Sequence, residues 1–335
     1  MHRSSIRCAF AIVFCLTTGC FDQQGDFEPR DWQQVRSGAP WGIRDAGSVA
    51  VHDGKMWVLG GWTYDQVSGD TTIFTDAWSS ADGNEWQEHA TPAWTFGMYT
   101  RAVSFKSNLL VMGGLKNSRQ PNEELTNEVW SSKGGDSWQL LGHAQWEPRI
   151  GFSLLTRGQE MWVLGGKTRN NGDHANLRND VWKSSDGVHW KLVTANAPWQ
   201  PRAFHCAFVH DDEIWVMGGG DWDSRFALND VWHSRDGVSW TREDDAPWKG
   251  RIWQSCVSYQ GAIWVMGGRT FEPLATDDEV WRSSNGNEWE FLSQTVRPDS
   301  RHAAYTAVFE GGIWTMGGSA NGYLHDDVWR YQGNQ

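Results

Sequence analysis

Cationic residues are scarce in this sequence of 335 residues. It holds 29 Lys and Arg against 41 Asp and Glu, which gives a formal net charge of -12. Nucleic acids and anionic membrane surfaces are bound by clustered cations. The charge balance therefore argues against either of them as a partner.

The residues of a recognisable catalytic centre are lacking as well. No His and Cys residues have the spacing of a zinc site, and Asp221-Trp-Asp223 is too short for a calcium loop. There is no Gly-x-Ser-x-Gly elbow and no phosphate-binding glycine loop. The sequence therefore predicts no metal, no cofactor and no catalytic residue that can be named, and it leans away from an enzyme.

Residues 8–16 form an apolar run that is too short to cross a bilayer core of about 30 Å, which needs about 20 residues. Arg3 and Arg7 precede the run, so the pattern indicates a secretory signal. The run ends in Leu-Thr-Thr-Gly-Cys at positions 16–20, which resembles a bacterial lipobox. The resemblance implies cleavage and lipidation at Cys20; an ordinary cleaved signal with an incidental cysteine is the alternative.

The residue after this motif indicates a location. Phe21 stands where an aspartate would retain a lipoprotein in the inner membrane, which favours the outer membrane if the envelope has two membranes. We expect residues 1–19 to be a signal peptide and residues 20–30 to be a lipid-anchored tether. The protein would then be exported, face the periplasm or the cell surface, and touch the membrane only through its lipid.

Tryptophan is abundant, with 25 residues, and its spacing reveals an internal repeat. Five pairs lie eight residues apart: Trp78/Trp86, Trp130/Trp138, Trp182/Trp190, Trp232/Trp240 and Trp281/Trp289. Six double glycines begin at Gly60, Gly113, Gly165, Gly218, Gly267 and Gly317, at steps of 49 to 53 residues. Repeats of about 50 residues with strand-like runs are typical of propeller blades.

Each repeat has the pattern of four strands. In the fourth repeat these are residues 204–209, 213–217 and 230–234 and a strand at Trp240. β-Branched and aromatic residues separated by Gly and Asp favour strands over helices.

The two ends of the sequence complete each other. A sixth pair begins at Trp329 but has no partner before the chain ends, whereas Trp32 has the matching position at the other end. We therefore predict an all-β, six-bladed propeller over residues 31–331. Its blades would be four-stranded and antiparallel, the N-terminal strand would close the ring, and the propeller would be monomeric.

These repeats resemble the kelch family. The shared features are an arginine that opens the first strand, a double glycine that ends the second, an aromatic residue on the third and a tryptophan on the fourth. One departure is tryptophan in place of the usual tyrosine on the third strand. Another is a Ser-x-Asp-Gly-x-x-Trp turn that looks like a shortened Asp-box, a structural turn in many propellers.

The resemblance also implies what the function could be. Bacterial six-bladed kelch proteins include a sialic-acid epimerase/mutarotase, which makes a sugar-acid enzyme the alternative to a binding function. The copper and Tyr-Cys arrangement of galactose oxidase, a relative in fold, cannot be built here. Cys206 and Cys256 are the only cysteines after Cys20.

An arginine opens the first strand in five of the six repeats: Arg44, Arg149, Arg202, Arg251 and Arg301. The second repeat has Gly97 there and Arg101 four residues later. One interpretation is a cationic funnel at the channel mouth, suited to a carboxylate or another anion. The other is a set of structural ion pairs with acids that recur once per repeat: Asp76, Glu128, Asp180, Asp230, Glu279 and Asp327. Strict repetition favours the structural interpretation.

The connections after the double glycines are long and dissimilar, and they share one end of the blades with the Ala-Pro-Trp segments. Variable loops on a rigid scaffold are where function concentrates, so we expect the ligand on this face. The candidate ligand-binding residues are Arg44, Trp62, Tyr64, Tyr99, Arg101, Arg149, Arg202, His205, Trp222, Arg225, Arg251, Trp253, Arg269, Arg301, His302 and Tyr323.

The last two cysteines occupy adjacent columns of neighbouring first strands. Cys206 lies four residues after Arg202, and Cys256 lies five after Arg251. Side chains alternate between the two faces of a strand, so this offset lets both sulfurs point into the interface between blades four and five. A disulfide is possible in an exported protein. The alternatives are strands too far apart to bridge, or two small buried hydrophobes.

The sequence therefore favours a binding or interaction module of the cell envelope, with a protein or a glycan as its ligand. A sugar-acid epimerase or mutarotase is the second hypothesis, and a structural role in envelope assembly is the third.

Overall fold

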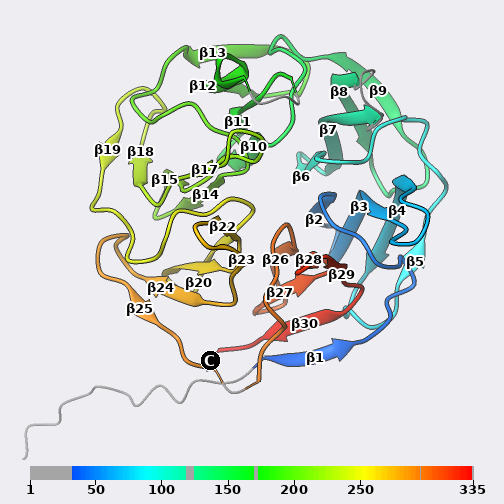
Figure 1. The fold of residues 1–335 in the computed structure, drawn as a ribbon. Helices are drawn as coiled ribbons and strands as arrows, with labels where there is room; N and C mark the ends of the chain where they lie inside the picture. The colour runs from blue at the N-terminus through cyan, green and yellow to red at the C-terminus, as the bar shows by residue number, and fades with distance from the viewer. Residues whose placement is uncertain (1–31, 118–123, 170–172, 295, 334–335) are drawn as a thin grey trace, which may run out of the picture.

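Six four-stranded antiparallel sheets follow one another around a ring (Figure 1). The computed structural model describes residues 32–117, 124–169, 173–294 and 296–333. The architecture confirms the predicted all-β, six-bladed propeller. The predicted signal peptide, Cys20 and the tether lie outside the described residues. Within the described ranges, no helix has both the length and the apolar character needed to span a membrane.

The first strand of each blade lines the channel. The blades are, in order, β2 (Ser48–His52), β3 (Lys55–Tyr64), β4 (Thr71–Ser80) and β5 (Gln87–Glu88); β6 (Arg101–Phe105), β7 (Asn108–Asn117), β8 (Glu124–Ser132) and β9 (Gln139–His143); β10 (Ser153–Arg157), β11 (Glu160–Lys167), β12 (Leu177–Ser184) and β13 (Trp190–Thr194).

The second half of the ring repeats this order. Its blades are β14 (Cys206–His210), β15 (Glu213–Met217), β18 (Val231–Ser234) and β19 (Thr241–Arg242); β20 (Ser255–Tyr259), β21 (Ala262–Met266), β24 (Val280–Ser283) and β25 (Glu290–Phe291); β26 (Tyr305–Phe309), β27 (Gly312–Met316), β30 (Val328–Tyr331) and β1 (Gln33–Arg36).

Short hairpins replace the simple connection after the double glycine in the last three blades. They are β16 (Gly220–Asp221) with β17 (Phe226–Ala227), β22 (Arg269–Phe271) with β23 (Leu274–Thr276), and β28 (Ser319–Ala320) with β29 (Tyr323–Leu324). Blade 3 has a short 3-10 helix, His174–Asn176, at the same place. We call the end of the propeller that carries these connections the loop face.

The N-terminal strand closes the ring as predicted. Strand β1 pairs antiparallel with β30, with Gln34 opposite Trp329. Trp32 is 3% exposed, donates a 2.8 Å hydrogen bond from its indole to Gln294 and packs on Tyr331 at 5.7 Å. Blade 6 therefore takes three strands from the C-terminus and one from the N-terminus, which leaves no unpaired edge at the junction.

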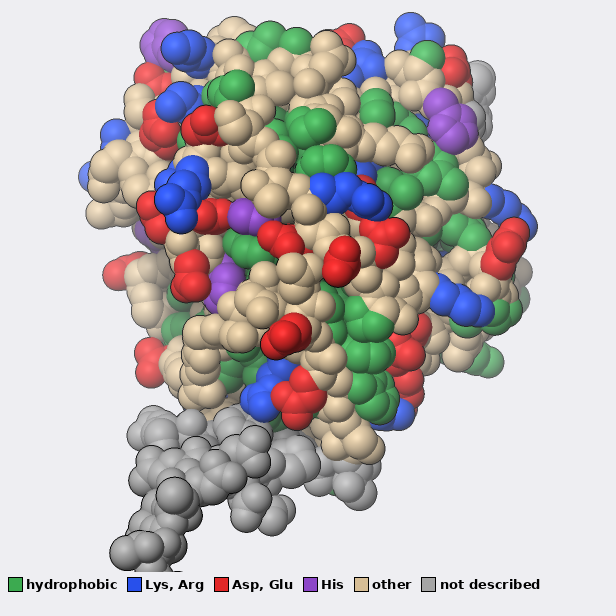
Figure 2. Space-filling model, turned by 90° about the vertical axis from the view of Figure 1, so that its left-hand side faces the viewer, with side chains coloured by type: hydrophobic (Ala, Val, Ile, Leu, Met, Phe, Trp, Pro, Cys, Tyr) green, Lys and Arg blue, Asp and Glu red, His purple; other side chains and the backbone are tan. Residues whose placement is uncertain are grey.

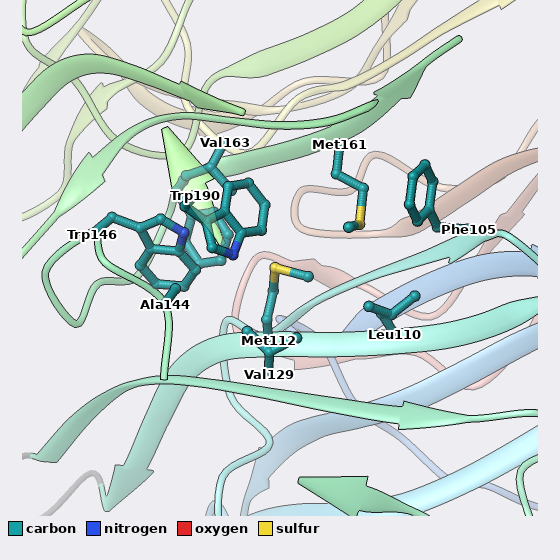
Figure 3. Packing of buried hydrophobic residues seen from close by; sticks show 10 residues of the cluster. Phe105, Leu110, Met112, Val129, Ala144, Trp146, Met161, Val163 and Trp190 are labelled. Atoms are coloured by element: carbon teal, nitrogen blue, oxygen red, sulfur yellow. The ribbon is translucent and has the colours of Figure 1, made fainter. Parts of the chain in front are cut away.

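The hydrophobic core lies between blades. In the interface of blades 2 and 3, Met112 and Val129 meet Met161, Val163 and Trp190, all buried (Figure 3). Each such side chain gains roughly 1.5–3 kcal/mol on leaving water. The apolar columns of the repeat are thus the contact surfaces of neighbouring sheets, and they hold the ring rigid.

The Ser-x-Asp-Gly-x-x-Trp turn is structural. In blade 3, Asp186 accepts 2.8 Å hydrogen bonds from the backbone N–H groups of Val188 and His189, while Trp190 donates to the carbonyl of Gly187 at 3.0 Å. In blade 1 the turn glycine is Gly83, and a Cβ there would lie 2.2 Å from a ring carbon of Trp314 in blade 6. The turn glycines and the tryptophans of the second strands therefore interlock adjacent blades.

The side of the propeller seen in Figure 2 shows no dominant charge. This view faces the side of the ring that holds β18, β19 and β25, where acidic and basic side chains are interspersed with apolar ones. Val238, in the turn between β18 and β19, is 55% exposed, and Phe291 of β25 is 48% exposed. Singly exposed apolar residues of this kind are normal on a soluble surface.

Candidate functional site

The six first strands enclose a cavity of about 220 Å³ at the end where they begin. Every repeat contributes to its wall, and the residues come from the four columns that start two positions after the repeated arginine. Ser48, Arg101, Ser153, Ser255 and Tyr305 line it among others. The cavity therefore opens toward the loop face, where the sequence predicts the ligand.

The five repeated arginines do not form a cationic funnel. Their nearest carboxylates lie at 2.7, 2.7, 2.5, 2.8 and 2.7 Å, and none of the five is more than 6% exposed. The pairs are Arg44–Asp76, Arg149–Asp180, Arg202–Asp230, Arg251–Glu279 and Arg301–Asp327. Each arginine also donates to the carbonyl of the first glycine of its own repeat. These contacts match the structural interpretation, in which carboxylates and carbonyls of the scaffold hold the five guanidiniums.

The second blade shows how the missing arginine is replaced. Gly97 leaves Glu128 without an arginine partner, and Lys116 pairs with this carboxylate at 2.9 Å instead. Gly97 itself is required, because a Cβ there would lie 1.6 Å from the carbonyl oxygen of Phe74.

Arg101 is the arginine that does reach the channel. Its Nε donates to the carbonyl of Phe152 and its Nη1 to that of Thr100, both at 2.8 Å. Ser48 and Ser153 occupy the same column of the repeat. Their hydroxyls likewise donate to a backbone carbonyl of the next blade, that of Thr100 and that of His205, respectively. Part of the role of Arg101 is therefore to join blades.

The charge of Arg101 is not neutralised. No carboxylate pairs with Arg101 among the residues that the structure describes, and burial lowers its pKa to about 10. The residue is half-buried and lines the cavity wall. It gives the channel one fixed positive charge.

Three aromatic residues in one column stand at the channel mouth. Tyr99, Phe204 and Trp253 have φ values of 57°, 55° and 57°, and the ring centroids of successive residues lie 5.2 and 5.0 Å apart. Left-handed backbone costs a residue with a side chain roughly 1–2 kcal/mol. Hydrogen bonds between adjacent blades hold this conformation, for example Trp253 N–H to the carbonyl of Phe204 at 3.0 Å. The backbone of the ring thus directs these rings to the mouth.

A second group of side chains extends this row over blades 4 to 6. The indole of Trp222 lies 5.3 Å from that of Trp253 and 5.7 Å from Phe271, and the guanidinium carbon of Arg269 lies 5.1 Å from the Trp222 ring. His302 stacks on Trp253 at 5.2 Å and 27°. Hairpins β16–β17 and β22–β23 supply Trp222, Arg269 and Phe271, and β17 contacts β22. We call Trp222, Trp253, Arg269, Phe271 and His302 the loop-face cluster.

The two predicted histidines are neutral. His205 is 5% exposed, neither ring nitrogen has a partner among the described residues, and burial together with Arg202 and Arg101 holds its pKa well below its usual range. Burial and the charge of Arg269 lower the pKa of His302 to about 3. Its Nδ1 is 3.2 Å from the hydroxyl of Thr276. Neither imidazole adds positive charge at neutral pH.

The remaining predicted residues lie elsewhere on the loop face. Trp62 and Tyr64 stack at 5.7 Å on blade 1, and the Tyr64 hydroxyl donates to the carbonyl of Gly322 in blade 6. Tyr323 is 65% exposed beside them, and Arg225 is exposed at the tip of β16–β17. The structure therefore brings Trp222, Trp253, Arg269 and His302 together, with Tyr99 and Arg101 adjoining them. Trp62, Tyr64 and Tyr323 lie around the junction of blades 1 and 6.

Two charged groups on this face escaped the sequence prediction. Lys167 is fully buried, with its ammonium 2.6 Å from both Asp221 and Asp223. Asp45 is 5% exposed, and burial raises its pKa to about 7 in spite of a hydrogen bond from Trp62. Asp45 stands in a column of the repeat that is apolar in most other repeats. A carboxylate at such a position was the feature of the sequence that could have indicated a buried acid.

Cys206 and Cys256 form a disulfide, with an S–S distance of 2.09 Å and a Cα–Cα distance of 5.9 Å. It joins β14 to β20, the first strands of blades 4 and 5, and it lines the cavity. The adjacent columns of the two residues place both sulfurs in one interface. Among the described residues no three His, Cys, Asp or Glu side chains are grouped so as to hold a metal ion.

Comparisons with known proteins point to the same fold. No family model matches the chain. Beta-scruin of Limulus polyphemus is 29% identical over 120 residues, which are 35% of this chain, and this chain spans only 12% of the length of that protein. The solved "Structure of YjhT" matches with a TM-score of 0.70 and 13% identity over 88% of this chain and 96% of the other. The structural similarity agrees with the observed β-propeller fold.

Proposed function

We propose that the protein is a binding module of the cell envelope that recognises a protein or carbohydrate ligand on its loop face. The observation that carries this proposal is the loop-face cluster, where half-exposed aromatic rings surround an arginine that has no acidic partner among the described residues. Ring faces and a few fixed polar groups are what binding sites present. The paired arginines and the interlocked blades supply the rigid support beneath.

Binding to glycan and peptide arrays tests the proposal. The wild-type protein and the Trp222→Ala variant would be compared, with Phe291→Ala on the outer wall as the control. We expect binding by the wild type and the control and its loss in Trp222→Ala. Equal binding by all three proteins would place the ligand elsewhere, and no binding by the wild type on either array would contradict the proposed function.

A sugar-acid epimerase or mutarotase is the second candidate, and Asp45 is the observation that favours it. A carboxyl with a pKa of about 7 is suited to proton transfer near neutral pH, and Arg101 offers a charge for a carboxylate on the channel wall. An NMR assay of anomer exchange in sugar acids tests this function. The absence of acceleration by the wild-type protein would exclude it, as would equal rates in the wild type and Asp45→Asn.

The location is part of the proposal. The Leu-Thr-Thr-Gly-Cys sequence at positions 16–20 supports export and lipidation at Cys20. Metabolic labelling with a radioactive fatty acid should mark the wild-type protein and leave Cys20→Ser unlabelled. Equal labelling of the two would exclude Cys20 as the lipid site.

A further inference from the structure

We infer that the loop-face cluster binds a carboxylate carried on a ring that has an apolar face. Arg269 would take the carboxylate, and the indoles of Trp222 and Trp253 would take the ring. This inference rests on the proposed function and names the ligand class for the same face. It follows from an unbalanced charge, a set of aromatic faces and the polarity of the groups between them.

The unbalanced charge belongs to Arg269. Its Nε is buried without a hydrogen-bond partner, and none of the ion pairs among the described residues includes it. Burial lowers its pKa, but an arginine remains a cation at neutral pH. An anion that accepts a hydrogen bond from this buried N–H would complete the site. Within the residues that the structure describes, that anion is missing.

The acids that follow β23 and the acid next to Trp222 are already engaged. Asp277 and Glu279 lie in the same blade, and they pair with Arg251 at 3.0 and 2.8 Å. Asp223, next to Trp222, pairs with Lys167 at 2.6 Å. The partner of Arg269 must therefore come from outside this network. Carboxylates fit a guanidinium well, because two oxygens can accept two parallel N–H groups.

The aromatic faces define the rest of the ligand. The Trp222 ring has the Arg269 guanidinium at 5.1 Å, Trp253 at 5.3 Å and Phe271 at 5.7 Å, and all four side chains are partly exposed. Stacking on an indole orients the guanidinium and leaves its N–H edge free. A ligand that reaches this edge lies beside exposed ring faces, where a flat or apolar ring gains from contact.

Two polar groups among these side chains are buried donors, on Arg269 and on Trp253. The Trp253 indole N–H is buried and has no acceptor among the described residues. His302 is neutral, since burial and Arg269 depress its pKa, and its Nδ1 is within 3.2 Å of the Thr276 hydroxyl. Two buried donors in want of acceptors, on Arg269 and Trp253, match an acceptor-rich group such as a carboxylate. An ammonium group would be repelled by Arg269 and would leave both of these donors unpaired.

Small-molecule probes test this inference directly. Benzoate, cyclohexanecarboxylate and glucuronate would each be titrated by ligand-observed NMR and calorimetry, beside benzamide, cyclohexanecarboxamide and glucuronamide. The wild type should bind at least one acid about tenfold or more tightly than its amide. Arg269→Met should abolish this preference, and Arg269→Lys should lose most of it because lysine lacks the bidentate fork.

A matched control separates this effect from net charge. Lys191→Gln removes one positive charge at an exposed position of β13 in blade 3, away from the loop-face cluster, and it should bind like the wild type. Circular dichroism and melting temperature confirm that each variant is folded. Preference for the acid retained in folded Arg269→Met would overturn the inference, as would failure of the wild type to distinguish any acid from its amide.

The outcome separates the inference from the function on which it rests. Array binding that is lost in Trp222→Ala but unchanged in Arg269→Met would keep the binding function and overturn the carboxylate site. No array binding by the wild type would contradict the function itself. An acid preference that requires both Arg269 and Trp222 supports both.

Discussion

Two cations occupy the same column of the repeat, two residues after the first glycine, and they meet opposite surroundings. Lys167 in blade 3 is fully buried between Asp221 and Asp223, each 2.6 Å from its ammonium. Arg269 in blade 5 is partly exposed, lies over an indole and has no acidic partner among the described residues. The charge of Lys167 is balanced within the protein, whereas no acid among the described residues balances the charge of Arg269.

The same contrast separates the repeated arginines from Arg101. Arg149 is closed off by Asp180 and by the carbonyl of Gly165. Arg101, displaced by four residues along its strand, keeps its charge on the cavity wall. Strict repetition therefore marks the scaffold of this propeller, whereas the departures Arg101 and Arg269 lie on the cavity wall and on the loop face.

A large loss of stability is expected from breaking the balanced position at Lys167. Asp221→Asn should leave the buried ammonium of Lys167 with one carboxylate partner in place of two. The free energy of unfolding should fall by about 3 kcal/mol, because one partner of a buried ion pair is lost. Urea unfolding of the wild type and the variant measures the change. Asp223→Asn is the milder control, because the Asp223 side chain is 34% exposed. A loss of stability no greater for Asp221→Asn than for this control would contradict the account of Lys167.

A second prediction compares two tryptophans. Trp190→Ala should destabilise the protein by roughly 3–5 kcal/mol, because this 6% exposed ring fills the interface of blades 2 and 3 (Figure 3). Trp222→Ala should cost clearly less, since its ring is partly exposed on the loop face. Thermal and urea unfolding check both. Equal losses of stability would show that Trp222 belongs to the scaffold.

A third prediction uses pH to examine the buried carboxyl that departs from its column. The pKa of Asp45 is about 7 in the folded protein and near 3.8 in the unfolded chain, so the folded state holds a proton that the unfolded state has lost between these values. The free energy of unfolding should fall as pH rises from about 4 to about 7, by up to about 4 kcal/mol.

The Asp45→Asn substitution removes this contribution. The stability of the wild type relative to the variant should therefore decrease over the same pH window and stay constant above it. Urea unfolding at pH 4.5, 6 and 8 measures the difference. A difference that does not change with pH would show that Asp45 titrates normally.

We expect the smallest effect on stability from a substitution of Arg269. Arg269→Met keeps an unbranched side chain over Trp222 and removes a charge that has no acidic partner among the described residues. The melting temperature should change by no more than about 2 °C, or rise. A large decrease would mean that Arg269 has a structural partner, like Lys167.

The sequence predicts the scaffold well because the scaffold is repeated. Six aligned double glycines give six blades, and Trp32 with Trp329 gives the closure of the ring. The recurring acids likewise predicted the pairing of the arginines. Each of these patterns recurs in several repeats, so it can be recognised even where one repeat departs from it.

The loop face could be predicted only in part, because each loop occurs once. Trp222, Trp253, Arg269 and His302 were predicted as candidate ligand-binding residues, but their contacts depend on how β16–β17 and β22–β23 fold. Neither the pairing of Lys167 nor the burial of Asp45 follows from spacing. The acids that pair with Lys167 lie in another blade. The burial of Asp45 depends on a backbone conformation that the repeat does not specify.

Selective ¹⁵N labelling of the tryptophan indoles tests most directly the claim that the scaffold and the binding face are separate. The signals of Trp222 and Trp253 would be assigned from Trp→Phe variants, and benzoate, cyclohexanecarboxylate and glucuronate would each be titrated into the full-length protein. We predict that the indole signals of Trp222 and Trp253 shift in a saturable way, while those of scaffold residues such as Trp57 and Trp162 stay in place. Shifts confined to scaffold tryptophans, or no saturable shift with any of the three acids, would contradict the account.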